Sequence, residues 1–446
     1  MRRYPPFSRR RSVLPPGPTD SPSLQSSEFA HHPYELFDRY RARYGDVFTL
    51  RMVGLPEMVV VGDPTLAQDV LARPSEFLGG AGNRATKVNV ALGDHFLMSL
   101  DGEAHERLQR RLLAIMATAR GRLMTDVRTL TRARMDSWPR DASFSLELEM
   151  QRLALDIILT VLLGADREPM RRRLGDLVHR MVGTSLLDGT PNMLRSSLGF
   201  FPLREDVHAL IDEEIDHRRR EGRGERIDVL STLLEPHDGE EAMTREEIRD
   251  QVLSMTVAGY DTTATTLTWA LLHLLDDPAV AAAVAPDVAR IAALAEPTAA
   301  ELLSATRLND LVNETARLFP VSPIVNRMTR VETRLGPWSL PPGIMVCPCL
   351  YLLHRHESFG DDADRFRLDR RPTQNRACFL PFGGGERRCI GQGFARPEMN
   401  LVLATILSSL RLEAVGAQPK GVRRGFVVIP DTGLPVRILG RASVAV

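Results

Sequence analysis

A glycine-rich loop that contains a single cysteine constrains this chain more than any other stretch. It reads FGGGERRCIG over residues 382–391, and apolar residues with helical spacing follow at once, from Phe394 to Leu410. The positive end of a helix dipole and neighbouring arginines favour the thiolate form of a cysteine in such a place. Cys389 is therefore a candidate metal ligand.

The spacing within the loop indicates the kind of metal centre. Glycines let a backbone lie close against a large flat group, and the pattern Phe-x-x-Gly-x-Arg-x-Cys-x-Gly resembles the haem-binding signature of the cytochromes P450. The resemblance implies haem b, with the sulfur of Cys389 as the axial ligand of the iron. The loop residues that would contact the cofactor are Phe382, Gly383, Arg387 and Gly391. The other interpretation is a free reactive or structural cysteine in a flexible loop.

Length and composition bound the architecture. A chain of 446 residues, 43% of them hydrophobic, can bury a large core, and length alone suggests two or three domains. However, no Gly/Ser- or Pro-rich linker divides the middle of the chain. We therefore expect one domain over residues 14–446, after a basic, disordered tail over residues 1–13. By resemblance, the fold is mainly α with small β-sheets (α+β) and has a β-rich N-terminal lobe.

Charge and cysteine usage narrow the function classes. The 57 basic and 57 acidic residues balance, which gives no sign of a nucleic-acid partner. The four cysteines have no disulfide-scaffold spacing, which indicates a reducing, cytoplasmic compartment. Residues 1–30 contain no apolar run that could form a signal peptide or a transmembrane anchor. The arginines of the tail leave contact with an anionic membrane surface as an alternative to simple disorder.

Hydrophobic periodicity predicts several elements outside the cysteine loop. A helix is expected over residues 32–44, and alternating apolar residues predict strands over residues 47–52 and 58–61. Near the C-terminus, residues 426–429 and 434–437 flank a turn and are expected to form a hairpin.

Two segments are expected to cover a substrate. Glycines interrupt residues 77–100, and residues 184–202 are rich in Gly, Pro, Ser and Leu between helices expected over residues 167–183 and 203–221. In the P450 family such segments form the lid of the substrate pocket. The apolar content of the second segment favours a hydrophobic substrate, although ordinary helix packing explains the same residues.

A long helix is expected in the middle of the chain. Thr244 and Glu247 form a capping box ahead of an apolar-rich segment that runs to residue 277. At a rise of 1.5 Å per residue, about 32 residues give roughly 48 Å, which crosses a whole domain. Residues 258–263 read AGYDTT and place polar and β-branched side chains in this helix. Such a local conflict is typical of a functional site.

The AGYDTT stretch resembles the oxygen-activating motif of the P450 central helix. The resemblance implies that Ala258 and Thr262, one turn apart, face the haem and that Gly259 lets the helix open. Asp261 would relay protons from solvent, and Thr262 would hold the reacting oxygen and its water by hydrogen bonds. The alternative for Thr262 is a hydroxyl that bonds back to the preceding turn.

Basic residues elsewhere match the propionate-binding positions of the family. His105 is present, but the residue four positions later is Gln109 instead of the usual arginine, so the anchoring is weaker or Arg110 has taken it over. Arg327 and Arg387 match two further propionate-binding arginines, and guanidinium groups bind carboxylates with paired hydrogen bonds. A solvated basic helix face explains the arginines that follow His105 equally well.

Glu314 and Arg317 form a Glu-x-x-Arg pattern on an expected helix. The pattern alone is weak, because such ion pairs are common on helix surfaces. By resemblance, the pair is buried, is joined by Arg370 and fixes the approach of the cysteine loop. We interpret these three residues as a structural lock with no catalytic role.

These observations predict a haem-thiolate monooxygenase. It would use O2 and two external electrons to hydroxylate or otherwise oxidise a hydrophobic small molecule, such as a natural product or lipid. We expect a monomer. Its electrons would come from a ferredoxin or flavodoxin with its reductase, because no flavin- or nicotinamide-binding domain is fused. The partner would dock on a basic patch formed by Arg107, Arg110, Arg111, Arg388 and Arg396. The alternatives are a haem-thiolate peroxygenase or isomerase, and a non-catalytic haem or ligand-binding protein.

Overall fold

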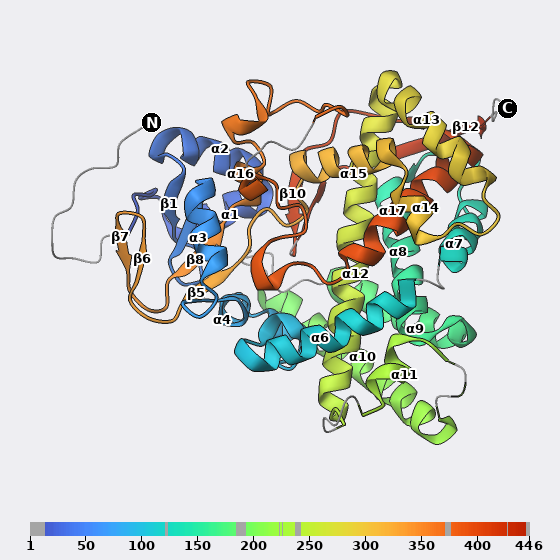
Figure 1. The fold of residues 1–446 in the computed structure, drawn as a ribbon, viewed down its shortest axis with the longest axis horizontal. Coiled ribbons are helices and arrows are strands. Elements are labelled where there is room, and N and C mark those ends of the chain that lie inside the picture. Colours follow the sequence, from blue (N-terminus) through green and yellow to red (C-terminus); the bar gives the residue numbers. More distant parts are fainter. Residues whose placement is uncertain are drawn as a thin grey trace.

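The computed structural model describes residues 14–120, 124–183, 193–222, 224, 226–236, 242–370, 376–425 and 427–442. The expected tail over residues 1–13 and part of the expected lid, residues 184–192, lie outside this described part of the chain. Helices account for most of the described residues, and the sheets are small (Figure 1). The mainly α fold with small β-sheets is therefore confirmed.

The longer helices form the body of the molecule in Figure 1. They are α6 (Gly102–Arg120), α7 (Met124–Asp136), α8 (Leu146–Leu163), α9 (Glu168–Gly183), α10 (Met193–Glu221), α12 (Arg245–Asp276), α13 (Pro278–Ala293), α15 (Thr306–Leu318) and α17 (Gln392–Ser409).

Shorter helices and 3-10 turns cover the N-terminal lobe and connect the longer elements. The helices are α1 (Pro22–His31), α2 (Pro33–Tyr44), α3 (Pro64–Ala72), α4 (Gly79–Ala85), α5 (Val88–Leu92), α11 (Val229–Leu233), α14 (Ala299–Leu303) and α16 (Leu350–Leu353). The 3-10 turns are η1 (Leu97–Ser99), η2 (Ala165–Arg167), η3 (Glu357–Phe359), η4 (Arg376–Cys378) and η5 (Gly385–Arg387).

Helix α12 is the central element of the body. The predicted capping box forms, because Thr244 Oγ1 accepts from the Glu247 N–H and the Glu247 carboxylate accepts from the Thr244 N–H. The helix then runs for 32 residues to Asp276. Most of its side chains are buried, and it passes through the middle of the molecule with α8 packed against it (Figure 1). A helix that is buried on all sides is the hydrophobic centre around which the others pack.

The N-terminal lobe contains a five-stranded sheet with the order β1-β2-β8-β5-β3. The predicted strand pair forms, with Val47 opposite Val61, and β2 then pairs in parallel with β8 from a distant part of the chain. Strand β5 begins at Arg327 and lies between β8 and β3, so this sheet carries one of the expected site residues. Its strands are β1 (Val47–Leu50), β2 (Met58–Val61), β3 (Phe77–Leu78), β5 (Arg327–Thr329) and β8 (Met345–Pro348).

The expected C-terminal hairpin is wrong in its pairing. Strand β11 (Val427–Pro430) pairs with β10 (Gly421–Arg424), whereas β12 (Pro435–Arg441) pairs with β9 (Leu410–Ala414) and β4 (Phe144–Ser145). Arg424 lies opposite Val427, so a tight connection that begins at Gly425 joins β10 to β11, and Gly425 has a φ of 58°. Glycine adopts this positive φ without strain. The remaining strands, β6 (Thr333–Leu335) and β7 (Trp338–Leu340), form a separate pair.

The glycine-rich stretch 77–100, which we expected to be irregular, contains the short helices α4 and α5. Its glycines permit close contact between segments. A Cβ on Gly80 would lie 2.5 Å from the Leu100 carbonyl oxygen, and a Cβ on Gly82 would lie 2.8 Å from the Arg327 Cα. Helix α4 is therefore seated directly against the start of β5.

Helix α10 also differs from the expectation, because it begins at Met193 where we expected a start at residue 203. Pro202 lies inside this helix. A proline removes one N–H donor and favours a kink, but it does not end a helix whose remaining residues are held by packing. The expected lid segment is therefore helical in its second half.

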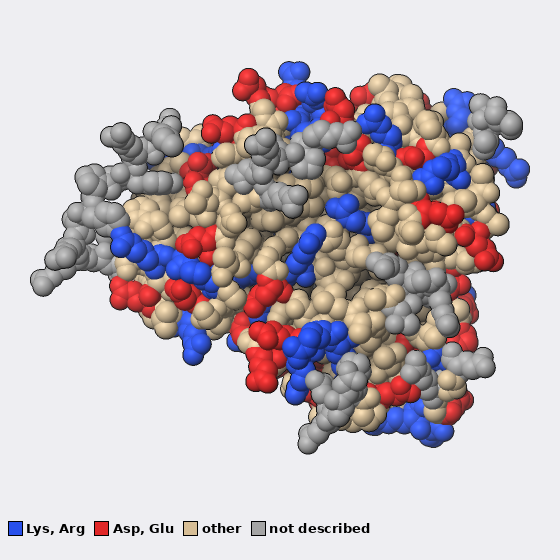
Figure 2. All heavy atoms as spheres, viewed as in Figure 1, with Lys and Arg blue, Asp and Glu red and all other residues tan. Residues whose placement is uncertain are grey.

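Within the described residues, no single helix is long and apolar enough to cross a membrane. Helices α12 and α13 pass the same test together, but they are bent by 115° at the break between them. On the face drawn in Figure 2, basic and acidic side chains are interspersed, and uncharged side chains cover much of the middle. This mixture agrees with the formal net charge of zero.

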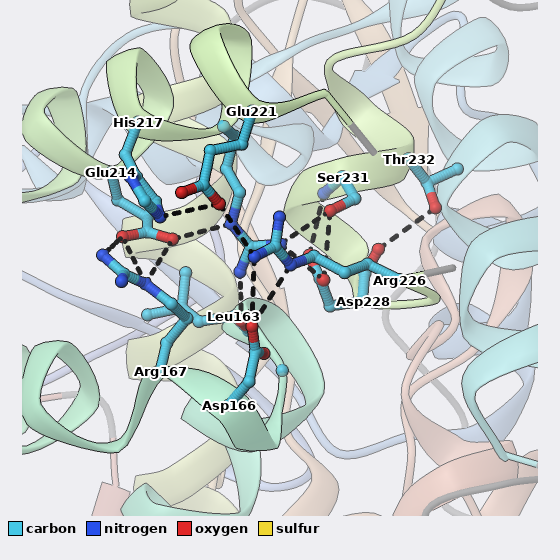
Figure 3. Close-up of polar contacts among 12 residues, drawn as sticks. Leu163, Asp166, Arg167, Glu214, His217, Glu221, Arg226, Asp228, Ser231 and Thr232 are labelled. Atoms are coloured by element: carbon cyan, nitrogen blue, oxygen red, sulfur yellow. Dashed lines mark hydrogen bonds and ion pairs between the residues drawn. The ribbon is translucent and has the colours of Figure 1, made fainter. Parts of the chain in front are cut away.

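A buried ion network ties the end of α10 to α8 and α11, in the region drawn in Figure 3. Arg218 donates to Glu214 at 2.7 Å and to Asp228 at 2.9 Å, and it also bonds the Leu163 carbonyl oxygen. Arg167 donates a further pair of hydrogen bonds to Glu214. The side chains of Arg218, Glu214 and Asp228 are only 1% to 3% exposed. Each buried charge is thus matched by an opposite one.

Replacing Arg218 by Met should lower the free energy of unfolding by about 3–5 kcal/mol, because Asp228 and part of Glu214 would stay buried without a counter-charge. Urea unfolding measures this change. Arg226→Met is the matched control from the same region (Figure 3), because the partners of Arg226, Asp166 and Glu221, are about half exposed. It should cost about 1 kcal/mol or less. Equal losses in the two variants would contradict the prediction.

Candidate active site

The cysteine loop is a tight turn that ends at the N-terminus of α17. The Cys389 N–H donates to the Phe382 carbonyl oxygen at 2.9 Å and closes the turn. Gly383 and Gly385 have φ values of 70° and 68°, which residues with side chains rarely adopt. A Cβ on Gly385 would also lie 2.6 Å from the Leu71 carbonyl oxygen on α3. The loop is thus pressed between α17 and the N-terminal lobe.

Cys389 differs from the other three cysteines, which are buried, because it is exposed. Surrounding protein atoms nevertheless raise the pKa of its thiol by burial, while the N–H groups of Gly391 and Gln392 and the charge of Arg388 act to lower that pKa. Burial is the larger effect, so the helix terminus alone does not secure the thiolate that the sequence led us to expect. A metal ion on the sulfur would do so, because coordination deprotonates a thiol.

The interrupted turn of α12 presents an accessible face inside a buried helix. Ala258 is exposed and Thr262 is half-buried, whereas Val257 and Tyr260 beside them are buried. Ala258 and Thr262 are one turn apart, so they share this face. The Thr262 hydroxyl donates to the Ala258 carbonyl oxygen at 2.8 Å, which is the back-bonding alternative considered from the sequence. A polar hydroxyl and a small methyl group therefore line the same accessible space.

Gly259 serves the packing of α12 against α8. A Cβ at this position would lie 2.8 Å from Cδ1 of Ile158, which is closer than real Cβ contacts. The glycine therefore lets α8 approach the interrupted turn. The sequence resemblance had suggested a different use, in which the glycine lets the helix open.

Asp261 is buried and points toward α8 and β10. Its Oδ1 accepts from Arg424 Nη2 at 2.5 Å and from Gln151 Nε2 at 3.4 Å. Burial raises the pKa of Asp261, and the charge of Arg424 opposes that rise. The ion pair with Arg424 thus holds the Asp261 carboxylate toward β10 and α8.

Three basic residues that were predicted to bind propionates lie close to one another. Burial lowers the pKa of His105 to about 4, and the charge of Arg387 lowers it further in the same direction. Burial also lowers the pKa of Arg327 to about 10, again with a contribution from Arg387. Each effect on a neighbour requires proximity, so the structure brings His105, Arg327 and Arg387 together.

The hydrogen bonding of this basic cluster is incomplete. His105 Nδ1 and Arg387 Nη1 are buried without a hydrogen-bond partner, and Arg327 forms no ion pair within the described part of the chain. Arg387 is partly satisfied, because its Nη2 donates to Asp101 at 2.7 Å. A buried polar group without a partner lowers the stability of a fold, so we interpret the unpartnered nitrogen atoms as a binding site for an anion.

Gln109 and Arg110 behave differently from one another. Gln109 Nε2 donates to the Glu386 carbonyl oxygen at 2.6 Å, so it supports the backbone of the cysteine loop. Arg110 is exposed. The exposed Arg110 therefore does not replace the propionate-binding arginine beside His105. Gln109 instead holds the cysteine loop through its hydrogen bond to the Glu386 carbonyl oxygen.

The donor set fits a haem. An accessible sulfur follows a glycine turn, and a small residue and a hydroxyl line an accessible helix face. Two buried nitrogen atoms of the basic cluster lack a hydrogen-bond partner. A flat tetrapyrrole with two carboxylates would satisfy these three features at once, through iron ligation, through contact with the helix face and through propionate hydrogen bonds.

Comparison with known proteins agrees with this fit. Residues 15–434 match the family described as Cytochrome P450. The Mycobacterium tuberculosis protein named cytochrome P450 135B1 is 32% identical over 97% of this chain and 93% of its own length. The chain belongs to the cytochrome P450 family. It is therefore a haem-dependent monooxygenase, an oxidoreductase.

Other P450s support the same assignment. Cytochrome P450 138 of Mycobacterium tuberculosis is 30% identical over 94% of this chain and 95% of its own. The haem domain of cytochrome P450DA matches with a TM-score of 0.82 and 24% identity, covering 97% of this chain and 99% of that one. A cyanobacterial P450 with bound retinoic acid matches with a TM-score of 0.84 and 19% identity, covering 97% and 100%. At these identities the two solved structures show the P450 fold alone.

Glu314, Arg317 and Arg370 form a buried cluster in this P450. Arg317 donates to both carboxylate oxygens of Glu314, at 2.7 and 2.8 Å, and Arg370 donates to the Oε1 atom at 3.0 Å. The side chains of all three residues are at most 7% exposed. Arg317 also donates to the carbonyl oxygens of His354 and Ala363. The cluster thus ties α15 to the segment that leads toward the cysteine loop.

The expected basic patch is smaller than the sequence suggested. Arg107, Arg110 and Arg388 are exposed. Arg111 is buried and donates to the carbonyl oxygens of Leu233 and Glu235 at the end of α11. Arg396 is only partly exposed and donates to Asn313. The last two arginines therefore hold helices together and do not belong to an open docking surface.

Sequence reasoning missed several residues that shape this site. Asp101 accepts from Arg387 and also from the Gly80 and Ala81 N–H groups at the start of α4. Arg424 holds Asp261 from a strand far along the chain. The glycines of α4 were the sequence signal for the contact with Asp101, because glycines permit close approach of the backbone. No sequence pattern marks Arg424.

Replacing Arg327 by Met should weaken haem binding without lowering the stability of the haem-free protein. The haem loses a charged hydrogen bond, so its transfer to apomyoglobin should become about 10- to 100-fold faster. The haem-free polypeptide loses a buried charge that has no ion pair among the described residues, so its free energy of unfolding should not fall. Arg330→Met, an exposed change just after β5, is the control and should alter neither measurement. Unchanged haem transfer in Arg327→Met would be incompatible with a propionate contact.

Proposed function

We propose that this P450 binds haem b through Cys389 and oxidises a hydrophobic small molecule, a natural product or lipid. The observation that carries the proposal is the combination of an accessible thiol after the glycine turn with the buried nitrogen atoms His105 Nδ1 and Arg387 Nη1, which lack a hydrogen-bond partner. His105, Arg327 and Arg387 would hold the propionates. Phe382, Gly383 and Gly391 would lie against the cofactor, with Ala258 on its other side.

When bound, haem supplies the redox chemistry that splits O2, with one oxygen atom entering the substrate and the other leaving as water. That reaction consumes two electrons and two protons. The chain's own contribution is to deliver the protons. The Thr262 hydroxyl donates to the Ala258 carbonyl oxygen in this structure and would exchange that bond for one to a water or bound oxygen on the accessible face. Asp261 would supply the protons from solvent.

A hydrophobic substrate is supported by the apolar character of the core in which α12 is packed. Leu92, Phe96 and Val257 are buried in the same apolar core. The cyanobacterial structural neighbour binds retinoic acid, a long apolar molecule with one carboxylate. We extend that preference to this chain as a class of substrate, an apolar molecule with few polar groups.

Electrons would come from a ferredoxin or flavodoxin with its reductase. Arg107, Arg110 and Arg388 remain exposed and would attract an acidic partner. We further propose a monomer, one P450 domain over residues 14–446, and a cytoplasmic location. The free state of Cys347, Cys349 and Cys378 supports a reducing compartment.

Turnover under labelled O2 tests the proposal. A library of apolar compounds is first screened for those that shift the haem absorption spectrum. The best binder is then incubated with a ferredoxin, its reductase and reduced nicotinamide under ¹⁸O2. Incorporation of one labelled atom into product is expected. Product formed from peroxide alone would favour a peroxygenase, an unlabelled rearranged product would favour an isomerase, and binding without any product would favour a non-catalytic protein.

Thr262→Ala should uncouple oxygen consumption from product formation. The variant keeps its haem and its substrate-induced spectral shift, but product per O2 should fall about tenfold or more, and hydrogen peroxide should take its place, because proton delivery is lost. Thr266→Ala is the matched control, since its hydroxyl bonds back to the Thr262 carbonyl oxygen one turn further along. If both variants stay coupled, Thr262 has no role in oxygen activation.

A further inference from the structure

Arg424 joins two carboxylates from different helices. Its Nη2 donates to Asp261 Oδ1 at 2.5 Å, and its Nη1 donates to Glu147 Oε1 at 2.5 Å. Gln151 bridges the same two acids, donating to Glu147 at 2.6 Å and to Asp261 at 3.4 Å. One guanidinium and one amide thus hold both acids together.

The fold assembles this group from three elements. Glu147 and Gln151 are one turn apart on the first part of α8 and therefore share a face. Asp261 is on α12, which packs along α8, and Arg424 ends strand β10 just before the tight turn at Gly425. The contact between Arg424 and Asp261 spans 163 positions in the sequence. This part of the site therefore exists only in the folded chain.

Solvent exposure rises outward from Asp261. The side chain of Asp261 is 9% exposed, that of Glu147 is 11% exposed and that of Arg424 is 22% exposed. The hydrogen-bonded group therefore extends from Arg424, its most exposed member, to Asp261, the residue before Thr262 in the sequence. Arg424 Nε is buried without a hydrogen-bond partner, so the arrangement also carries a cost that packing alone does not explain.

We propose that Arg424 is a positioning residue for proton delivery and that Glu147 is the outer carboxylate of the same relay. A proton taken from solvent at Glu147 reaches Asp261 while one guanidinium holds both acids. Asp261 then passes the proton toward Thr262. This inference rests on the proposed oxygen-activating function and adds two residues to it.

The charges around the pair explain why an arginine is needed. Burial and the nearby charge of Glu147 raise the pKa of Asp261, and an acid that binds its proton too tightly is a poor donor. The charge of Arg424 counters both burial and Glu147 at Asp261. Protonation of Asp261 removes its negative charge and so weakens its ion pair with Arg424. A protonated Asp261 is therefore released from Arg424.

Other titratable groups face the same cluster. Tyr260 precedes Asp261 on α12, and burial raises its pKa far above the neutral range. His179 on α9 lies near Glu147, and burial with the charges of Arg152 and Arg424 lowers its pKa. Asp176 acts on His179 in the opposite direction. Tyr260 therefore keeps its proton and His179 stays neutral, so neither group adds a charge beside the two carboxylates.

The first test follows the carboxyl groups directly and needs no turnover. Infrared spectra of the haem-loaded protein are recorded as a function of pH, and the protonated carboxyl band of Asp261 is assigned by its loss in Asp261→Asn. In Arg424→Gln this band should persist to higher pH, because the opposing charge is gone. Arg424→Lys keeps the charge and should restore much of the original titration. Arg423→Gln is the control on the same strand, since Arg423 lies over the Phe29 ring.

The second test measures proton delivery without an organic substrate. Ferredoxin-driven O2 consumption and hydrogen peroxide release are measured in H2O and D2O. In Glu147→Gln and Arg424→Gln the share of O2 reduced to water should fall about tenfold or more, with a larger solvent isotope effect. Arg423→Gln should match the unaltered protein. Glu147→Gln keeps the ion pair between Arg424 and Asp261, so it remains informative if Arg424→Gln fails to fold.

The two tests separate the inference from the proposed function. A changed infrared titration together with a changed isotope effect supports the relay. An altered titration with unaltered O2 reduction would make Arg424 and Glu147 structural and overturn the relay. If the protein without substitutions reduces no O2 with any redox partner, both the proposed function and the relay are overturned. The infrared result would still show whether Arg424 controls the protonation of Asp261.

Discussion

The buried carboxylate of Glu314 is the interaction on which the geometry of this P450 depends. It accepts from Arg317, from Arg370 and from the Arg367 N–H, so it joins α15 to the loop that contains Arg367 and Arg370. Arg317 also holds the His354 carbonyl oxygen. A charge buried this deeply is tolerated only because three donors surround it, and removing one donor would cost several kcal/mol.

This network continues to the cysteine loop through hydrogen bonds. The imidazole Nε2 of His354 accepts from the Leu380 N–H at 3.0 Å, and the Leu380 carbonyl oxygen accepts from the Gly383 N–H at 2.9 Å. Gly383 lies at the start of the turn that positions Cys389. A chain of hydrogen bonds thus connects this ion cluster to the turn that carries the sulfur, which supports a structural role for Glu314, Arg317 and Arg370.

Sequence reasoning found the features that local patterns encode. The cysteine loop, the capping box of α12 and the strand pair near Val47 follow from spacing and periodicity within a few residues. The predicted C-terminal pairing was wrong because alternation of apolar residues indicates a strand but not the strand with which it pairs. Strand β12 in fact pairs with β9 and β4. The relay through Arg424 was missed for the same reason, since its partner Asp261 is 163 positions away and a single arginine in a strand carries no pattern.

The most direct test of this account is the absorption difference spectrum of the reduced protein with and without carbon monoxide. We expect a strongly red-shifted Soret band, because a Cys389 thiolate bound to the iron would donate electron density to it. Cys389→Ser should abolish that band. A band at the position of histidine-ligated haem in the unaltered protein, or the absence of bound haem, would contradict the assignment of Cys389 as the iron ligand.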